Sequence, residues 1–229
     1  DLNGAEGSYT ARLFGDDMKQ QGEDLTVEDK DVFKLKDGQT MFIYGLPDGT
    51  AYKVTEQNMP AGFQRISAEG DKGTITGGTV SAASFVNSYK AVLPESADTA
   101  EFFKGGKILD GRDWKTGESF KFVIKAQGNA PETEQTEAVL VAGPDENYDD
   151  GSEVSFDFGK ADFTKPGTYS YVIYEEEPAE KTPGISYSQA LYTVEVNVSD
   201  DGSGALKAES KMTQATGDDA QETPFLQRL

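Results

Sequence analysis

Short runs of alternating hydrophobic and polar residues recur along this chain, and that alternation is typical of β-strands. Hydrophobic runs of this kind occupy residues 8–14, 32–35, 40–44, 82–89, 101–109, 119–125, 154–158, 190–198 and 205–210. Turns rich in Gly, Pro and Asp separate the runs, and an acidic loop is expected between residue 125 and about residue 153. No segment shows a 3.6-residue hydrophobic period over ten or more residues. The pattern predicts an all-β fold made of Ig-like β-sandwiches.

Two further predictions concern how these runs are connected. Residues 32–35 and 40–44 flank the turn Lys36-Asp37-Gly38-Gln39 and are expected to pair as a hairpin. Residues 90–98 have the composition of a linker. We therefore predict two tandem domains, residues 1–93 and residues 94–229.

One stretch of sequence occurs twice, once in each predicted domain. Pro47 to Glu56 and Pro166 to Glu175 each contain a Pro/Gly turn, an alternating strand and a closing glutamate. Side chains two positions apart in a strand point to the same face, so each glutamate shares a face with the apolar residues before it. A carboxylate on a core face is costly unless it is neutral or paired. Glu56 and Glu175 are therefore the first candidates for a functional role.

Composition removes several classes of function. The chain has 229 residues, a formal net charge of −20, no cysteine and no histidine. Nucleic acid is not expected as a partner, because it requires a basic surface. Thiol nucleophiles, Ser-His-Asp triads, disulfides and most zinc sites are excluded, and no cofactor or metal is expected. No hydrophobic run has the length of a membrane span, so direct membrane insertion is not expected either.

The order of several motifs resembles that of domains in Gram-positive surface proteins. In the first unit, Gly45-Leu46-Pro47, the strand Tyr52 to Glu56 and the strand Phe85 to Tyr89 resemble the B-type domain of collagen adhesins. In the second unit, Gly106 to Arg112 and the strand ending at Glu175 resemble the streptococcal pilin isopeptide-linkage domain. The resemblance implies that the first domain lacks its opening strands, which are expected upstream of residue 1.

Such domains form an intramolecular bond between a lysine and an asparagine, assisted by a glutamate. The resemblance implies that Glu56 and Glu175 relay protons, and that Asn87 and Lys107 are crosslinking residues. The chemistry requires a neutral amine and a protonated acid, and burial favours both. Gln227 stands where the pattern of the second domain has asparagine, so the partner of Lys107 is left open. Self-crosslinking happens once per molecule, so the chain is not expected to be an enzyme.

Simpler interpretations stay open for each of these residues. Glu56 and Glu175 can be solvated carboxylates at strand ends, and Asn87 can be an ordinary polar residue of an edge strand. Lys107 can be a solvated lysine, with Lys104 as the nearest alternative for its role.

Two other kinds of site have weaker support in the sequence. The run Asp145 to Gly151 has carboxylates spaced as in a calcium loop, but its glycine comes one position late and no closing glutamate follows. A glycosidase would need two paired carboxylates, such as Glu175 with Glu195 or Asp157, but their spacing in the sequence does not require them to lie close together. An acidic hairpin loop and a non-enzymatic domain are the preferred interpretations.

The expected function follows from the resemblance. It implies a structural or stalk module of a cell-wall-anchored bacterial surface protein or pilin, located outside the cell, with its signal peptide and anchor outside this chain. The expected partners are other domains or subunits of the same surface protein. The alternative is an adhesin module that binds a host protein or a glycan.

Overall fold

A computed structural model describes residues 1–3, 5–143, 148–216 and 219–222. The chain divides into two units, Asp1–Tyr89 and Lys90–Leu229, whereas the sequence-based boundary falls after Leu93. Every regular element in the described residues is a strand except one short 3-10 helix, so the all-β prediction is confirmed. Within these residues no helix is long and apolar enough to cross a membrane.

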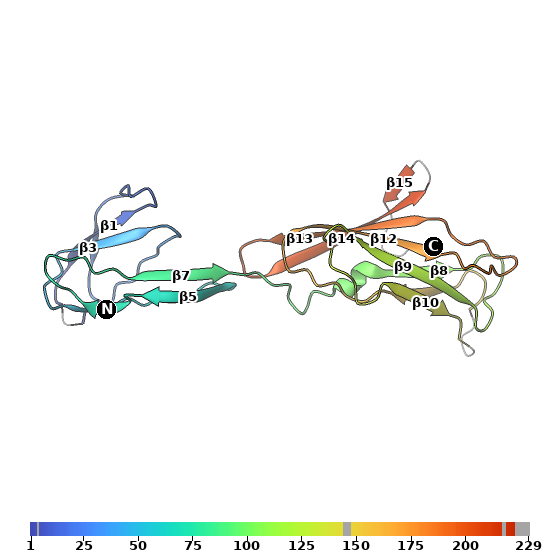
Figure 1. The fold of residues 1–229 in the computed structure, drawn as a ribbon, viewed down its shortest axis with the longest axis horizontal. Coiled ribbons are helices and arrows are strands. Elements are labelled where there is room, and N and C mark those ends of the chain that lie inside the picture. Colours follow the sequence, from blue (N-terminus) through green and yellow to red (C-terminus); the bar gives the residue numbers. More distant parts are fainter. Residues whose placement is uncertain (4, 144–147, 217–218, 223–229) are drawn as a thin grey trace. The chain divides into compact units, whose positions relative to one another are not determined.

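Unit 2 contains a long antiparallel sheet and a short one (Figure 1). Its elements are η1 (Thr99–Phe103), β8 (Lys104–Ile108), β9 (Ser119–Gln127), β10 (Glu137–Val141), β11 (Glu153–Asp157), β12 (Gly167–Glu176), β13 (Leu191–Asp200), β14 (Leu206–Thr216) and β15 (Asp219–Glu222). The six-stranded sheet has the order β10-β9-β12-β13-β14-β15, and β8 pairs with β11 in the second sheet. The strands alternate buried and exposed residues, as expected for two sheets that enclose a core.

The core of unit 2 lies between these sheets and is rich in aromatic residues. Phe122 on β9 stacks on Phe156 of β11, with ring centroids 4.0 Å apart and an interplanar angle of 8°. Tyr171 on β12 is fully buried, and its hydroxyl donates a hydrogen bond of 2.8 Å to the Pro131 main-chain oxygen. Burial raises the pKa of Tyr171, and the negative charge of Glu132 adds to the shift. The hydroxyl therefore stays protonated and satisfied inside the core.

Two glycines allow the short sheet to approach the core closely. Gly105 pairs with Phe156 across β8 and β11, and a Cβ atom at Gly105 would lie only 2.6 Å from Phe156 Cζ. A Cβ atom at Gly106 would clash with the side chain of Glu153. A side chain at Gly105 would displace the Phe156 ring, whereas the flexible Glu153 side chain can move away from one at Gly106. Gly105 is therefore the position where β8 depends most on glycine.

Unit 1 consists of three small antiparallel sheets. Its strands are β1 (Tyr9–Phe14), β2 (Leu25–Val27), β3 (Thr40–Tyr44), β4 (Ala51–Lys53), β5 (Phe63–Glu69), β6 (Lys72–Thr74) and β7 (Ser84–Tyr89). The sheets are β2-β1-β3, β4-β6 and β5-β7. Only four hydrophobic residues are buried among the described residues of unit 1, compared with 24 in unit 2. Unit 1 therefore has a much smaller core, and many of its hydrophobic side chains are exposed.

Two sequence-based predictions about strands were wrong in unit 1. Residues 32–35 form no strand, and β3 pairs with β1 instead of closing a hairpin with them. The strand predicted to reach Glu56 ends at Lys53, because its partner β6 has only three residues. Long-range pairing decided each case, and local alternation does not encode it.

Unit 2 departs from the predictions in two places. The loop expected up to about residue 153 contains β10, whose Ala138 and Leu140 face the core. The run predicted at 101–109 divides into η1 and β8, since Asp98 caps the 3-10 helix by accepting a hydrogen bond from Ala100 N. β10 was missed because its short apolar run lies within an acidic and polar segment.

Candidate functional site

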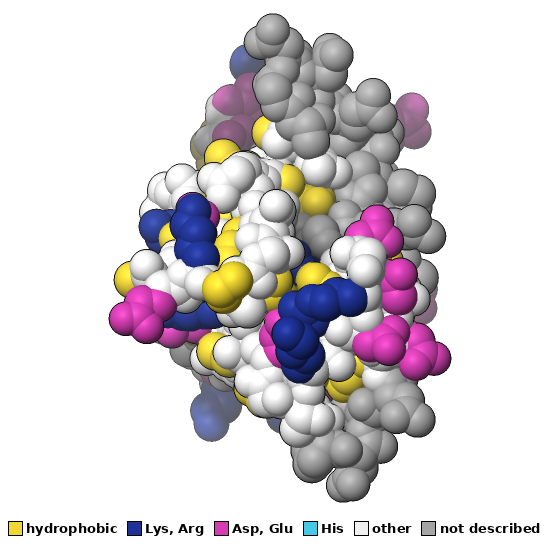
Figure 2. All heavy atoms as spheres, turned by 90° about the vertical axis from the view of Figure 1, so that its right-hand side faces the viewer, with side chains coloured by type: hydrophobic (Ala, Val, Ile, Leu, Met, Phe, Trp, Pro, Cys, Tyr) yellow, Lys and Arg dark blue, Asp and Glu magenta, His cyan; other side chains and the backbone are white. Residues whose placement is uncertain are grey.

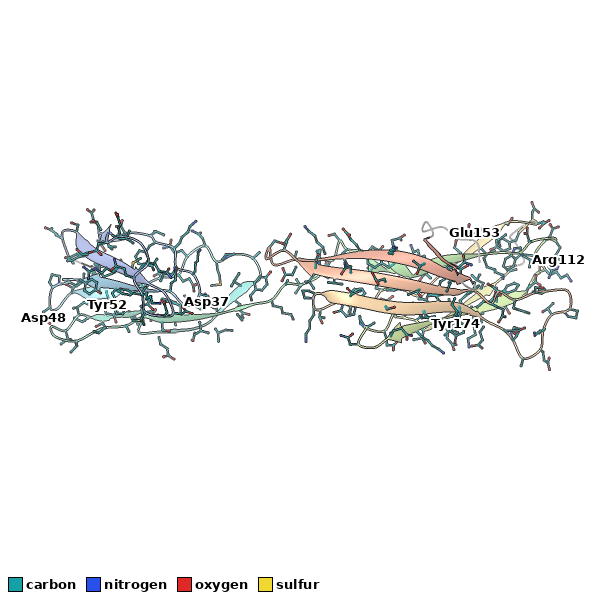
Figure 3. The ribbon with its side chains drawn as sticks, turned by 90° about the horizontal axis from the view of Figure 1, so that it is seen from above. Asp37, Asp48, Tyr52, Arg112, Glu153 and Tyr174 are labelled. Carbon is teal, nitrogen blue, oxygen red and sulfur yellow. The ribbon has the colours of Figure 1, made fainter. Side chains whose placement is uncertain are left out.

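A buried ion pair joins the two sheets of unit 2. Lys107 lies on β8 and Glu175 on β12, directly after Tyr174, which Figure 3 labels. Lys107 Nζ is 2.9 Å from Glu175 Oε2. The side chains are 5% and 0% exposed, respectively. Two residues that are 68 positions apart in the chain are thus held together, away from water.

The surroundings of this pair provide hydrogen-bond partners for only one of the two Glu175 side-chain oxygens. Glu175 Oε2 also accepts a hydrogen bond of 2.8 Å from Ser188 N. Glu175 Oε1 is buried and has no hydrogen-bond partner among the described residues. Lys107 Nζ lies 4.9 Å from the centre of the Phe120 ring, so the ammonium has an aromatic face as a further neighbour. A buried oxygen without a partner is costly, which suggests that the site is arranged to receive one more polar group.

Tyr192 is a buried residue of this site that the sequence-based reasoning did not single out. Tyr192 lies on β13 and is 2% exposed to solvent. Burial raises the pKa of Tyr192, and the negative charge of Glu175 raises it further. The phenol therefore remains neutral near the pair. Its position in the alternating run with Val194 and Val196 was a signal that it faces the core.

Unit 1 holds the corresponding glutamate and an asparagine, but in a more open position. Asn87 on β7 donates a hydrogen bond of 2.6 Å from Nδ2 to Glu56 Oε1. Glu56 Oε2 is buried and has no hydrogen-bond partner among the described residues. The ion pairs found in the described part of unit 1 join Arg12, Lys19 and Lys30 to aspartates. None of these ion pairs includes Glu56, which the structure brings together with Asn87.

Other candidate residues from the sequence lie elsewhere. Lys104, the alternative to Lys107, forms an exposed ion pair with Glu101. Gln227 lies outside the described residues. The suggested calcium loop lies partly outside them, and its Asp150 accepts a hydrogen bond from Gly111 N. In the part of the chain that the structure describes, no group of three or more acidic side chains is arranged to hold a metal ion.

The end of unit 2 seen in Figure 2 shows basic and acidic side chains next to one another, not a patch of one sign. Arg112, labelled near this end in Figure 3, binds Glu118 through two hydrogen bonds of 3.0 and 2.5 Å. This pairing holds the pKa of Glu118 below its usual range. The pair ties the turn after β8 to the start of β9, and it has the geometry of a structural ion pair.

Comparison with known proteins gives a family match in each unit. Residues 103–225 match the family described as "Spy0128-like isopeptide containing domain" (FctA). Residues 1–89 match a family described as a "Domain of unknown function" (DUF7601). A pilin of Streptococcus pyogenes serotype M1 is 38% identical to this chain over 74 residues. The matched segment covers 32% of this chain and 21% of that pilin.

Proposed function

Because this chain belongs to the family of Spy0128-like isopeptide containing domains, we propose that it is a structural stalk module of a pilin-type bacterial surface protein. One observation carries the proposal: Lys107 Nζ and Glu175 Oε2 are 2.9 Å apart and buried between the two sheets of unit 2. A lysine and a glutamate that are buried in direct contact favour chemistry on the protein itself.

The proposed reaction links Lys107 to a side-chain carboxamide from the end of the chain. Lys107 gives up a proton to Glu175 and attacks the carboxamide carbon as a neutral amine. Glu175 returns a proton to the departing nitrogen, so that one ammonia leaves for each amide bond formed. The unpartnered Glu175 Oε1 is the atom suited to hold the carboxamide group. Gln227 stands where the family pattern has the acceptor asparagine, so it is the first residue to test as the acceptor.

Such a bond would stabilise unit 2 against extension. It would join β8, the first strand of the unit, to the segment after β15. By analogy with a disulfide, closing a loop of about 120 residues restricts the unfolded chain by roughly 5 kcal/mol. The bond also needs no oxidising compartment, which suits a chain without cysteine.

For unit 1 we propose a related role with a collagen-adhesin B-type architecture. The proposal rests on the repeated glutamate motif and on the Glu56–Asn87 hydrogen bond of 2.6 Å. The proposed partners of the whole chain are other subunits or domains of the same surface protein, and the proposed location is the Gram-positive cell wall. The similarity to a streptococcal pilin supports both proposals.

Trypsin digestion of the native chain tests this function. We expect unit 2 to persist as a resistant fragment, and we expect Lys107→Arg to remove most of that resistance because the guanidinium does not replace the amine as a nucleophile. Lys104→Arg is the matched control, since Lys104 is exposed and lies on the same strand. Equal resistance of both variants and the wild type would contradict a covalent role for Lys107.

A further inference from the structure

Trp114 has a buried N–H group without a hydrogen-bond partner. The residue lies in the loop between β8 and β9 and is 8% exposed. Its main-chain N donates a hydrogen bond of 2.9 Å to the Tyr148 main-chain oxygen, and its ring packs on Phe120 with centroids 5.2 Å apart. Backbone and ring are thus both held, but Nε1 is buried and has no partner among the described residues. Such a donor is costly and rare, so the ring is placed to receive an acceptor atom.

Trp114 lies close to the Lys107–Glu175 pair, because Phe120 contacts both. Lys107 Nζ is 4.9 Å from the centre of the Phe120 ring, and the centre of the Trp114 ring is 5.2 Å from the same point. The ammonium and the Trp114 ring are therefore separated by no more than the sum of these two distances. Lys107 Nζ and Ser188 N both bond to Glu175 Oε2, which leaves Oε1 without a partner in the described chain. The region around Phe120 thus contains two buried polar atoms that lack hydrogen bonds.

These two atoms have opposite hydrogen-bonding character. The indole N–H of Trp114 can only donate, and an oxygen of an ionised carboxylate such as Glu175 can only accept. A carboxamide offers one group of each kind, because its oxygen accepts and its NH2 group donates. An ionised carboxylate has no proton to donate to Glu175 Oε1 and is repelled by its negative charge. The two atoms together therefore favour a carboxamide over a carboxylate as their occupant.

The N–H of Trp114 also matches the charge that develops in the proposed reaction. When the Lys107 amine attacks the carboxamide carbon, the carboxamide oxygen gains negative charge. A fixed donor in a buried site stabilises this charge more than water does. Lys107 and Glu175 exchange protons during the reaction, whereas the indole N–H is a donor only and stays one throughout.

We propose that Trp114 Nε1–H binds the oxygen of the carboxamide that Lys107 attacks, and that it thereby selects a carboxamide as the acceptor. This inference rests on the proposed function and deepens it by naming a residue that touches the acceptor. The bond between Lys107 Nζ and the carboxamide carbon forms while the bond from this carbon to its NH2 group breaks. Glu175 takes a proton from the amine and delivers a proton to the leaving nitrogen, which departs as ammonia. Trp114 neither gains nor loses a proton.

Replacement of the indole N–H by sulfur tests this role. The chain contains one tryptophan, so cell-free translation with 3-benzothienylalanine in place of tryptophan changes position 114 alone. This analogue keeps the bicyclic ring but has no N–H group. Translation is stopped at intervals in denaturant, and the intact mass of the full chain gives the fraction that has lost ammonia. A chain made with 5-fluorotryptophan, a foreign analogue that keeps the N–H, is the matched control.

We expect the benzothienylalanine chain to lose ammonia at least about 100-fold more slowly than the wild type, which is the effect of removing one donor from an oxyanion site. The fluorotryptophan chain should react at nearly the wild-type rate, and circular dichroism checks that both chains fold. Equal rates in all three chains would overturn the role of Trp114 and leave the function of unit 2 standing. A wild-type chain that loses no ammonia would overturn both.

The wild-type chain offers a second test that needs no substitution. One tryptophan gives one indole signal in a 15N–1H correlation spectrum of the labelled chain. We expect a coupling across the hydrogen bond from the indole nitrogen to the carbonyl carbon that is bonded to Lys107 Nζ. A coupling to any other carbonyl carbon, or no coupling, would overturn the proposal, whereas the mass of the same sample reports on the crosslink itself.

Discussion

Removal of one member of the Lys107–Glu175 pair should destabilise unit 2 more than removal of both. At 2.9 Å and an effective dielectric constant near 20, the attraction between the two charges is about 6 kcal/mol. Most of this attraction offsets the loss of hydration of two nearly fully buried groups. A single substitution, Glu175→Gln or Lys107→Met, leaves one buried charge without its partner and costs about 3–5 kcal/mol. The double variant leaves no unpaired charge.

We therefore expect the double variant to be more stable than either single variant by about 3 kcal/mol, or roughly 10 °C in melting temperature for a unit of this size. None of the three variants can form the proposed bond, so the comparison among them isolates the ion pair. The fluorescence of Trp114 reports on unit 2 alone, because it is the one tryptophan of the chain and packs on Phe120.

An ion pair on the surface provides the control for this comparison of single and double variants. Lys121 Nζ lies 3.3 Å from Glu176 Oε1, and the side chains are 32% and 46% exposed. The same substitutions there should leave the melting temperature nearly unchanged, because water solvates either charge once its partner is gone. The reasoning would be refuted if the Lys107/Glu175 double variant melted at or below the temperature of both single variants.

Three further changes test other parts of unit 2. Gly105→Ala should lower its stability by about 1–3 kcal/mol in chemical denaturation, because the added methyl group displaces Phe156; an unchanged midpoint would contradict the close approach. Tyr171→Phe should cost about 1 kcal/mol at neutral pH by removing a buried hydrogen bond, and no loss would show that the hydroxyl is not satisfied there. Glu118→Gln should destabilise the unit at pH 7 but not in acid. The folded-state pKa of Glu118 is lowered by Arg112, so this stabilisation is present above the unfolded value of 4.5 and is lost as pH falls through the folded value; a pH-independent difference would contradict it.

Sequence alternation predicted the strands that are long and carry one clear buried face. β9, β12 and β13 each follow it, and the phase of the repeated motif placed Glu175 among buried residues. The pairing of Lys107 with Glu175 was implied by family resemblance, and the structure brings these two residues together. Their chemical roles stay a proposal.

The remaining features depend on contacts between distant segments. β4 stops before Glu56 because its partner β6 is short. β3 pairs with β1, which lies far from it in the sequence, and not with residues 32–35. The burial of Tyr192 beside Glu175 needs two neighbouring strands in a defined register. None of these relations is present in a local pattern of apolar residues.

The most direct test of the account is the intact mass of the purified chain under denaturing conditions. We expect a mass lower than the sequence mass by one ammonia, and a crosslinked peptide that contains Lys107 after digestion. Glu175→Gln should restore the full sequence mass while the chain still folds. A wild-type chain that folds, shows the full sequence mass and yields Lys107 in an unmodified peptide would contradict the central claim that unit 2 crosslinks itself.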